Sequence, residues 1–478
     1  MAVTAEAAEF TAATRPGDIP GDVIQAAKRS IVDGFGLAVA GLRSEPGALA
    51  TEYAAEFARP GQPGTGQPGT GQEEAGHSAA RQPGTRTRLP ARFAAFAAGV
   101  CIHADDFDDT QLAVSADRVY GLLTHPTAPV LAAAAAVADA RGLSGVELLT
   151  GYTVGVEVAT KVAEAIDPRH YQDGFHSTGT AGTIGAAAAV ANLLRLDPGA
   201  TATVLGLAAS QAAGLRENFG TMTKPFHAGR AAESAIVSAD LAGRGWTAAP
   251  DILEAPRGFF RAAGGGFDPS LITGRLGSPW TFSEPGVSIK PFPSGSLTHP
   301  AMCALADLVT GHDIKPADIA AIYAGTNRHM PTALIHHRPA NALQAKFSME
   351  YCLAVTAIER TPGLADFTGE RVGRPDVQDL LRRVEFTVDP AADAAGYNTM
   401  YSIVRVTLAD GTTLEERRKF ATGSPQHPMS ADQLLGKFDR NLAWAGLADA
   451  ARRSAAAERL LDLEHEPAVP ALLDLLVP

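Results

Sequence analysis

The chain has 478 residues, of which 46% are hydrophobic and 19% charged, and its formal net charge is −12. This composition is typical of a folded globular protein, and the length predicts more than one domain. The negative charge excludes general nucleic-acid binding, which needs clustered Lys and Arg, but it permits an anionic small molecule held by a few local cations.

Three widely spaced cysteines without a CxxC pair predict a reduced protein without a zinc or iron–sulfur signature. The first residues carry no basic-then-apolar signal, and charged residues interrupt every Ala-rich run before it reaches membrane-spanning length. We therefore expect a cytoplasmic protein with no membrane partner.

The first half of the chain is predicted to be helical, beginning with apolar spacings of three and four over 22–42. The pentapeptide QPGTG then occurs twice within 62–71, which marks 59–88 as a low-complexity loop or disordered insertion of no assigned function. Ser144 and Glu147 form a capping-box signature for a helix over 146–166. Further helical patterns begin at Arg92, at Pro126, at Ala181, at Pro198 and at Ala231.

The pattern changes beyond about residue 280, where short runs rich in β-branched residues predict strands. These runs cover 287–292, 319–323, 383–388 and 403–408, with Asp410-Gly411 as a hairpin signal and helices over 299–309 and 344–358. From Ser430 the chain is again helical. We predict a mainly α fold that combines a large helical domain with a smaller α+β domain.

Polar side chains gather in 214–232, between two Ala-rich helical patterns. They are Arg216, Glu217, Asn218, Thr221, Thr223, Lys224, His227 and Arg230. Pro225 biases Lys224 away from the α region, which predicts a break before the next helix. Further polar groups interrupt the helices at Asp105–Thr110, His125, His176 and Lys290–His299. Solvated helix corners are one interpretation, and one shared cleft is the other.

Two kinds of chemistry fit these groups. The DDxxD pattern at Asp105–Asp109 could hold Mg²⁺ against a diphosphate, but a second acidic motif and HExxH-like spacing are absent, so we expect no metal site. Asp, His and Lys together can instead abstract a proton α to a carboxylate and stabilise the resulting enediolate. A lysine Schiff base, with a ketone or with pyridoxal phosphate, is a further alternative, although no phosphate cup is evident.

Six motifs in order resemble the MmgE/PrpD family, which includes 2-methylcitrate dehydratase, cis-aconitate decarboxylase and iminodisuccinate epimerase. They are DFDDT at 106–110, HPTAPV at 125–130, GFHSTGTAGTIG at 174–185, TKPFHAGRAA at 223–232, KPFPSGSLTHP at 290–300 and AKFSMEY at 345–351. The resemblance spans nearly the whole chain apart from the QPGTG insertion. It implies a helical domain over 1–275, an α+β lid over 276–425, C-terminal helices over 426–478 that pack back on the helical domain, a homodimer and no cofactor.

Carried over by motif, the expected catalytic residues are Asp106, Thr110, His125, His176 and Lys224. Arg118, Tyr120, His227, Lys290, Ser294 and Ser296 are expected to bind substrate, and Arg230 to support Lys224. The sequence departs from the decarboxylases at three places. Ser294 and Gly295 follow Pro293 where a histidine is expected one residue on, so that the nearest histidine is His299. The connection from Thr110 to His125 is longer, and Ile335 stands where a tyrosine is expected.

These features predict a cofactor-independent lyase on a small di- or tricarboxylate, with elimination of water favoured over decarboxylation. Reprotonation on the opposite face would instead make an isomerase or epimerase. A catalytically silent binding paralogue is the third alternative, which the altered Ser294–Ser296 loop permits.

Overall fold

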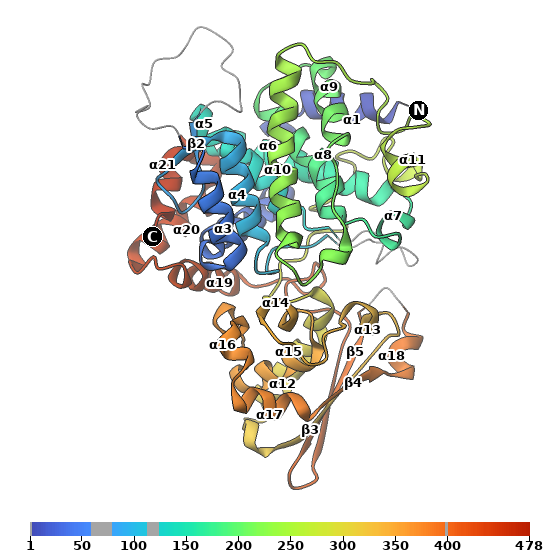
Figure 1. Ribbon diagram of the computed structural model, residues 1–478, viewed down its shortest axis with the longest axis vertical. Coiled ribbons are helices and arrows are strands. Elements are labelled where there is room, and N and C mark those ends of the chain that lie inside the picture. The colour runs from blue at the N-terminus through green and yellow to red at the C-terminus, as the bar shows by residue number, and fades with distance from the viewer. Residues whose placement is uncertain (1, 59–78, 112–123, 397–399) are drawn as a thin grey trace.

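The protein is described by a computed structural model that covers residues 2–58, 79–111, 124–396 and 400–478. Arg118, Tyr120 and residues 59–78 of the predicted insertion therefore lie outside the described residues. Figure 1 shows a large helical part and, below it, a smaller part that contains a sheet. The predicted mainly α fold with a smaller α+β region is confirmed.

The helical part is built from both ends of the chain, as the colours of Figure 1 show. Its N-terminal helices are α1 (Val3–Ala13), α2 (Gly21–Ala40), α3 (Glu45–Ala55), α4 (Ala91–His103), α5 (Thr127–Arg141), α6 (Gly145–Ala165), α7 (Arg169–Gln172), α8 (Ser177–Leu193), α9 (Pro198–Ala209), α10 (Thr223–Gly243) and α11 (Phe259–Gly264). Its C-terminal helices are α19 (Ala431–Trp444), α20 (Ala450–Leu461) and α21 (Val469–Leu473). Helix α19 packs against α2, so the end of the chain returns to its beginning.

Helix α8 lies at the centre of this part and packs against α5, α6, α9 and α10. Its contact with α6 is close because Gly155 and Gly185 face each other, and a Cβ atom on Gly185 would overlap the carbonyl oxygen of Gly155. The small residues of α8 thus allow the close helix approach that the sequence predicts. This packing fixes the N-terminal end of α8, where His176 is the N-cap residue.

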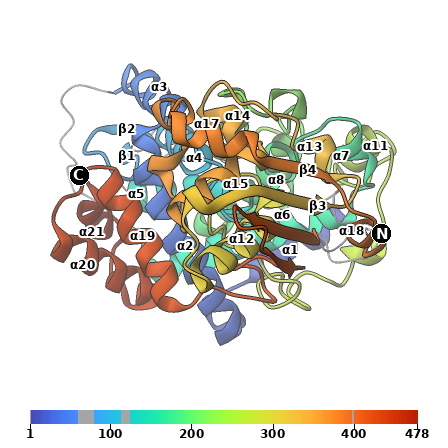
Figure 2. The ribbon, with the colours of Figure 1, turned by 90° about the horizontal axis from the view of Figure 1, so that it is seen from below.

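The smaller part contains a four-stranded sheet in the order β4-β3-β5-β6. Its strands are β3 (Ile319–Thr326), β4 (Val384–Val388), β5 (Ser402–Leu408) and β6 (Thr413–Arg418). Strand β3 pairs parallel to β4 and antiparallel to β5, and β5 pairs antiparallel to β6 through the predicted Asp410-Gly411 hairpin. The helices of this part are α12 (His299–Gly311), α13 (Met330–Ala333), α14 (Ala342–Ala345), α15 (Met349–Glu359), α16 (Gly369–Val372), α17 (Pro375–Arg382) and α18 (Pro390–Ala394). Helix α12 packs against β5 and β6, and α15 packs against α12 and β4. Figure 2 shows these helices and the sheet from below.

Some local predictions are wrong. The segment 287–292 is not a strand, because Ser288 pairs only with Thr110 and Ile289 with Gly423, and Pro291 has no N–H to extend a ladder. Residues 177–180 form the first turn of α8, so this helix begins four residues before the predicted start at Ala181. Helix α10 begins at Thr223, so Lys224 lies inside its first turn, where Pro225 is tolerated.

The described end of the predicted insertion also differs from a loop. Strand β1 (Ala79–Arg81) pairs antiparallel with β2 (Arg88–Pro90). Arg81 is buried because it pairs with Asp139 on α5. Among the described helices, none combines the length and the apolar character needed to cross a membrane.

Candidate active site

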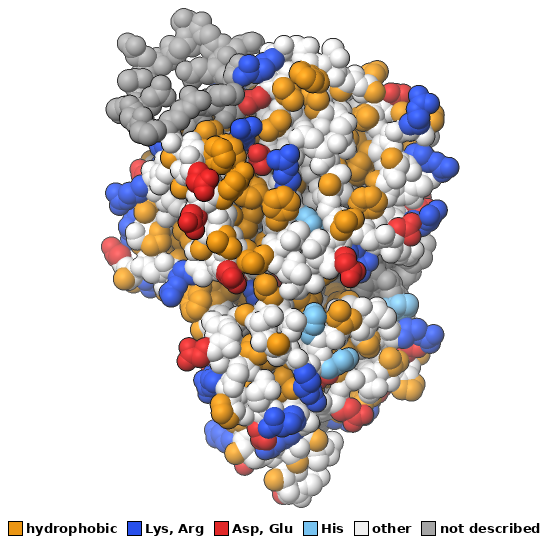
Figure 3. Space-filling view, in the orientation of Figure 1, with side chains coloured by type: hydrophobic (Ala, Val, Ile, Leu, Met, Phe, Trp, Pro, Cys, Tyr) orange, Lys and Arg blue, Asp and Glu red, His pale blue; other side chains and the backbone are white. Residues whose placement is uncertain are grey.

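A cavity of about 520 Å³ lies where the two parts meet. The helical part contributes Asp106, His125, His176 and Lys224 to its wall, and Lys290 comes from the connection to the smaller part. The smaller part contributes Ser296, Leu297, Leu334, Ile335 and Phe347. Histidine side chains are visible at this junction on the face drawn in Figure 3.

Asp106 joins two lysines inside the cavity. Its Oδ1 atom lies 2.5 Å from the Nζ atom of Lys224 and 2.9 Å from that of Lys290. Lys290 also donates to the carbonyl oxygen of Asp106 at 2.8 Å. Burial alone would raise the pKa of Asp106, but the two ammonium groups hold it well below its ordinary value. Asp106 has a φ of 51°, and its Oδ2 atom is buried without a partner among the described residues. A strained, half-satisfied carboxylate of this kind is typical of a functional site.

His125 is held in one tautomer. Its Nδ1 atom lies 3.0 Å from the carbonyl oxygen of Asp109, which can only accept, so Nδ1 carries the proton and Nε2 carries a lone pair. The Nε2 atom is 3.9 Å from Asp106 Oδ1. Burial and the nearby Lys290 lower the pKa of His125 well below its ordinary value, so the ring is neutral. A neutral imidazole with a free lone pair is suited to act as a general base.

His176 faces the same cavity from the start of α8. Its Nδ1 atom lies 3.0 Å from Nδ1 of His227, and its buried Nε2 atom has no partner among the described residues. Burial and the neighbouring His103 lower the pKa of His176. His227 does not line the cavity. It contacts His176 instead of reaching the position expected for a substrate-binding residue.

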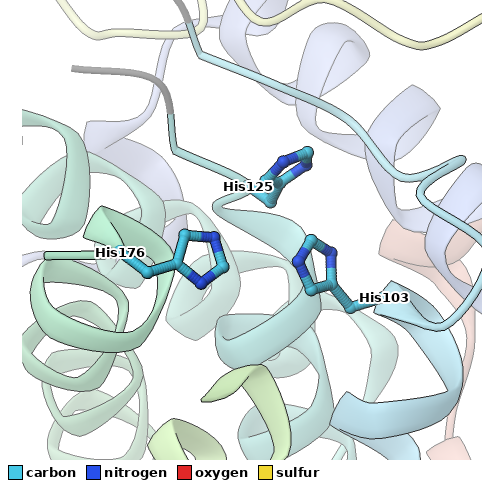
Figure 4. Close-up of side chains that lie close together, drawn as sticks. All are labelled: His103, His125 and His176. Atoms are coloured by element: carbon cyan, nitrogen blue, oxygen red, sulfur yellow. The ribbon is translucent and has the colours of Figure 1, made fainter. Parts of the chain in front are cut away.

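His103, which the sequence analysis missed, completes a group of three histidines. Figure 4 shows the rings of His103, His125 and His176 turned toward one another. The centroid of the His103 ring is 4.5 Å from that of His125 and 5.7 Å from that of His176. The only sequence signal for His103 is its place at the end of a helix, three residues before Asp106.

Asp108 orients His103 from behind. The Nδ1 atom of His103 lies 2.9 Å from Asp108 Oδ2 and 3.0 Å from its Oδ1. Burial raises the pKa of Asp108 to about 7, although Lys290 and Lys224 act in the opposite direction. Neither group lines the cavity, so the pair supports His125 and His176 rather than a ligand.

The remaining predicted residues are placed differently from one another. Ser296 lines the cavity, and its Oγ atom is 3.4 Å from that of Thr110, which lies just behind the wall. Ser294 is buried against Thr298 and does not line the cavity. Arg230 is half exposed and pairs with Glu233, away from Lys224. Arg118 and Tyr120 are not among the described residues.

Two further lysines tie the walls together. Lys346 of the smaller part lies 2.7 Å from Asp105 at the end of α4. Lys437 of α19 donates to the carbonyl oxygens of Phe107 and Lys290 at 2.8 and 2.9 Å, and its Nζ atom is 2.7 Å from Asp33 Oδ1. Sequence reasoning missed both, because each joins segments that are far apart in the chain.

Ligand atoms of His103, His125 and His176 lie within 4.8 Å of one another, as do those of His103, Asp106, Asp108 and His125. Three neutral imidazoles have the donors that a transition metal prefers. The two ammonium groups on Asp106 already supply positive charge beside His125, so a further cation there would be repelled. The charge arrangement instead favours an anionic ligand.

The similarity of this chain to known proteins covers most of its length. The sequence model of the MmgE/PrpD N-terminal domain matches residues 5–272, and that of the MmgE/PrpD C-terminal domain matches residues 292–463. Cis-aconitate decarboxylase of Homo sapiens is 29% identical over 437 residues, which cover 89% of this chain and 84% of the relative. The enzyme of that name from Mus musculus is 29% identical over 366 residues, covering 74% and 72%. The one from Aspergillus terreus is 27% identical over 497 residues, covering 99% and 96%.

Proposed function

The chain belongs to the MmgE/PrpD family, and on that premise we propose that it is a cofactor-independent lyase acting on a small di- or tricarboxylate. The observation that carries the proposal is the buried Asp106 carboxylate shared by Lys224 and Lys290 beside the unprotonated Nε2 atom of His125. This arrangement offers a base and two cations to one substrate carbon and its carboxylate.

In the proposed reaction, His125 Nε2 takes the proton from the carbon next to a substrate carboxylate. The electron pair moves into that carboxylate, and the ammonium groups of Lys224 and Lys290 stabilise the enediolate. Loss of a β-hydroxyl then breaks the carbon–oxygen bond, and a proton from the enzyme leaves with it as water. The ammonium group of Lys224 is the proposed proton donor, and His176, Thr110 and Ser296 are proposed to orient the substrate and its leaving hydroxyl.

Decarboxylation is the second candidate, favoured by the names of the relatives, all of which are cis-aconitate decarboxylases or like them. Here the bond to a carboxylate breaks, carbon dioxide leaves, and the same acid protonates the carbanion. The expected extra histidine is not supplied by His299, because its Nε2 atom donates to the carbonyl oxygen of Ser294 and the residue does not line the cavity. Ile335 lines the cavity where a tyrosine is expected. These two differences support elimination of water as the primary proposal.

An isomerase or epimerase would use the same residues but return the proton to the opposite face. A binding paralogue without activity would keep the fold alone. The buried charges at Asp106 argue against this last alternative, because ionised groups are costly to bury without a use.

Mass spectrometry of polycarboxylates incubated with the enzyme in deuterated water separates these reactions. We expect loss of water from a hydroxylated substrate such as 2-methylcitrate or citrate, without added metal and in the presence of a chelator. Loss of carbon dioxide from cis-aconitate would establish the second candidate, and a gain of one mass unit alone would establish the isomerase. No change in any polycarboxylate would refute the lyase.

We also propose a homodimer, supported by an aromatic face that α3, α4 and α10 share. Tyr53, Phe57 and Phe226 on this face are 48%, 39% and 44% exposed, and Phe57 stacks on Phe93 at 4.0 Å. Hydrophobic side chains gather over these helices in Figure 3. A contiguous exposed apolar surface of this kind marks an interaction site.

Light scattering tests the dimer directly. Phe57→Ser is expected to give a monomer, whereas Trp246→Ser, which changes a 59% exposed aromatic residue elsewhere, leaves the mass unchanged. A wild-type monomer would contradict the proposal. Cys101, Cys303 and Cys352 are free and buried, which fits the reducing, cytoplasmic location that we propose.

A further inference from the structure

Arg216 is one of the residues that the helical part contributes to the wall of the cavity. It opens a single 3-10 turn, η3 (Arg216–Asn218), between α9 and α10. Its backbone N–H donates to the carbonyl oxygen of Gly174 at 2.8 Å, and His176 donates to Gly214 at 3.0 Å. The same pair of chain segments therefore holds Arg216 and His176 in place.

The guanidinium group of Arg216 is positioned by one aromatic ring and one carbonyl. Its Cζ atom lies 3.7 Å from the centroid of the Tyr171 ring, and its Nη1 atom donates to the carbonyl oxygen of Tyr171 at 2.7 Å. Its Nε atom is buried and has no hydrogen-bond partner among the described residues. An arginine stacked in this way presents a planar fork that matches a carboxylate.

The acidic groups Asp106 and Asp173 near the cavity are paired with cations other than Arg216, so the charge of Arg216 is available to an anion. Asp106 is shared by two lysines, and Asp173 pairs with Arg169 at 3.1 Å. Within the described residues, no carboxylate forms an ion pair with Arg216, although Glu217 lines the cavity beside it. Arg216 is thus a cation of the cavity wall that is held by an aromatic ring rather than by an acid.

Phe219 lies between Arg216 and the lysine side of the cavity. The centroid of its ring is 5.8 Å from Arg216 Cζ and 5.3 Å from Lys224 Nζ. A substrate that spans this ring meets a cation at each end. Leu215 and Leu334 also line the cavity, so apolar side chains are available to the connecting carbons of the substrate.

We propose that Arg216 binds a second carboxylate of the substrate, distant from the one held by Lys224 and Lys290, and so sets the preference for polycarboxylates. The inference rests on the proposed function, since it takes the substrate to be a carboxylate. A hydrogen-bonded ion pair of this kind contributes on the order of a 10-fold to 100-fold change in affinity.

Titration calorimetry with two unreactive probes tests the proposal. Tricarballylate has a carboxylate at each end and one in the middle, and methylsuccinate is the same molecule without one end carboxylate. The wild type is expected to bind tricarballylate at least about 10-fold more tightly than methylsuccinate. In Arg216→Gln this preference should disappear, because tricarballylate affinity falls while methylsuccinate affinity stays the same.

The matched control is Arg230→Gln, which removes a half-exposed arginine of α10 that lies outside the cavity and should leave both affinities unchanged. Arg216→Lys keeps the charge without the fork and is expected to retain part of the preference. Thermal unfolding confirms that each variant is folded. An Arg216→Gln variant that keeps the wild-type preference overturns the role of Arg216, whereas a wild type that binds neither probe overturns the carboxylate substrate itself.

Discussion

Lys224 and Asp106 meet across the cavity, with Nζ and Oδ1 2.5 Å apart, although 118 residues separate them in the chain. Both side chains are about 6% exposed, so the pair is removed from water. A buried pair of this kind is held by its surroundings, and losing either partner leaves an uncompensated charge. The Lys224–Asp106 ion pair therefore contributes both to the stability of the site and to the proposed chemistry.

Replacing Lys224 with Met is expected to lower kcat/KM by about 100-fold to 1,000-fold, because one of the two cations that stabilise the enediolate is lost. Lys290 still pairs with Asp106, so the variant should fold. Steady-state kinetics on the substrate found by mass spectrometry gives the measurement. Lys28→Met is the matched control, since Lys28 is as buried and pairs with Glu464 far from the cavity. Equal losses in the two variants would contradict the role of Lys224.

Replacing His103 with Gln is expected to lower kcat by about 10-fold to 100-fold with little change in KM. His103 does not line the cavity, so the loss comes from misplacing His125 and His176 rather than from weaker binding. His170→Gln serves as the control, because His170 is also buried and hydrogen-bonded but its ring contacts Phe175 and Phe259 instead of the cavity histidines. An effect confined to KM would argue for direct substrate contact instead.

Replacing Lys437 with Met is expected to reduce the free energy of unfolding by about 3–5 kcal/mol, because Asp33 is left buried without its cation. The double variant Asp33→Asn, Lys437→Met should recover part of this loss, since neither charge remains. Urea denaturation of the wild type, both single variants and the double variant closes the cycle. Strictly additive losses would show that the two residues do not interact.

His299 gives the protein a sensitivity to acid. Burial and the nearby Lys290 lower its pKa to about 3 in the folded protein, while in the unfolded chain it stays near 6.5. Between these values the unfolded chain binds the proton and the folded protein does not, so stability falls as the pH falls, by up to about 1.4 kcal/mol per pH unit.

The variant His299→Gln lacks this pH-dependent contribution to the free energy of unfolding. We expect it to be less stable than the wild type at about pH 7, and the difference to shrink by about 2 kcal/mol at about pH 5. Urea denaturation of both proteins across this range measures the change. Parallel pH profiles would show that His299 is protonated equally in the folded and unfolded states.

Local patterns in the sequence predict much of the fold. The capping box at Ser144 and Glu147 forms at the start of α6, and the Asp410-Gly411 turn joins β5 to β6. The strand predicted at 287–292 fails because Ser288 and Ile289 pair with single residues of two different segments. The division into domains at 275 and 425 stays a prediction.

The candidate site was predictable to the extent that motifs mark it. Asp106, His125, His176, Lys224 and Lys290 do line one cavity, while their catalytic roles stay predictions. His103 and Lys437 could not be found in this way, because their partners are fixed only by tertiary packing. Lys437 reaches Phe107 from 330 residues away.

The hydrogen bonds from Lys437 to the carbonyl oxygens of Phe107 and Lys290 bear on when the cavity can form during synthesis of the chain. While α19 is still inside the ribosome, Asp33 is without its buried cation and the segments carrying Asp106 and Lys290 are not yet held together. The nascent chain can therefore form its central helices but not a working cavity. We therefore expect the cavity to assemble only after Lys437 has emerged from the ribosome.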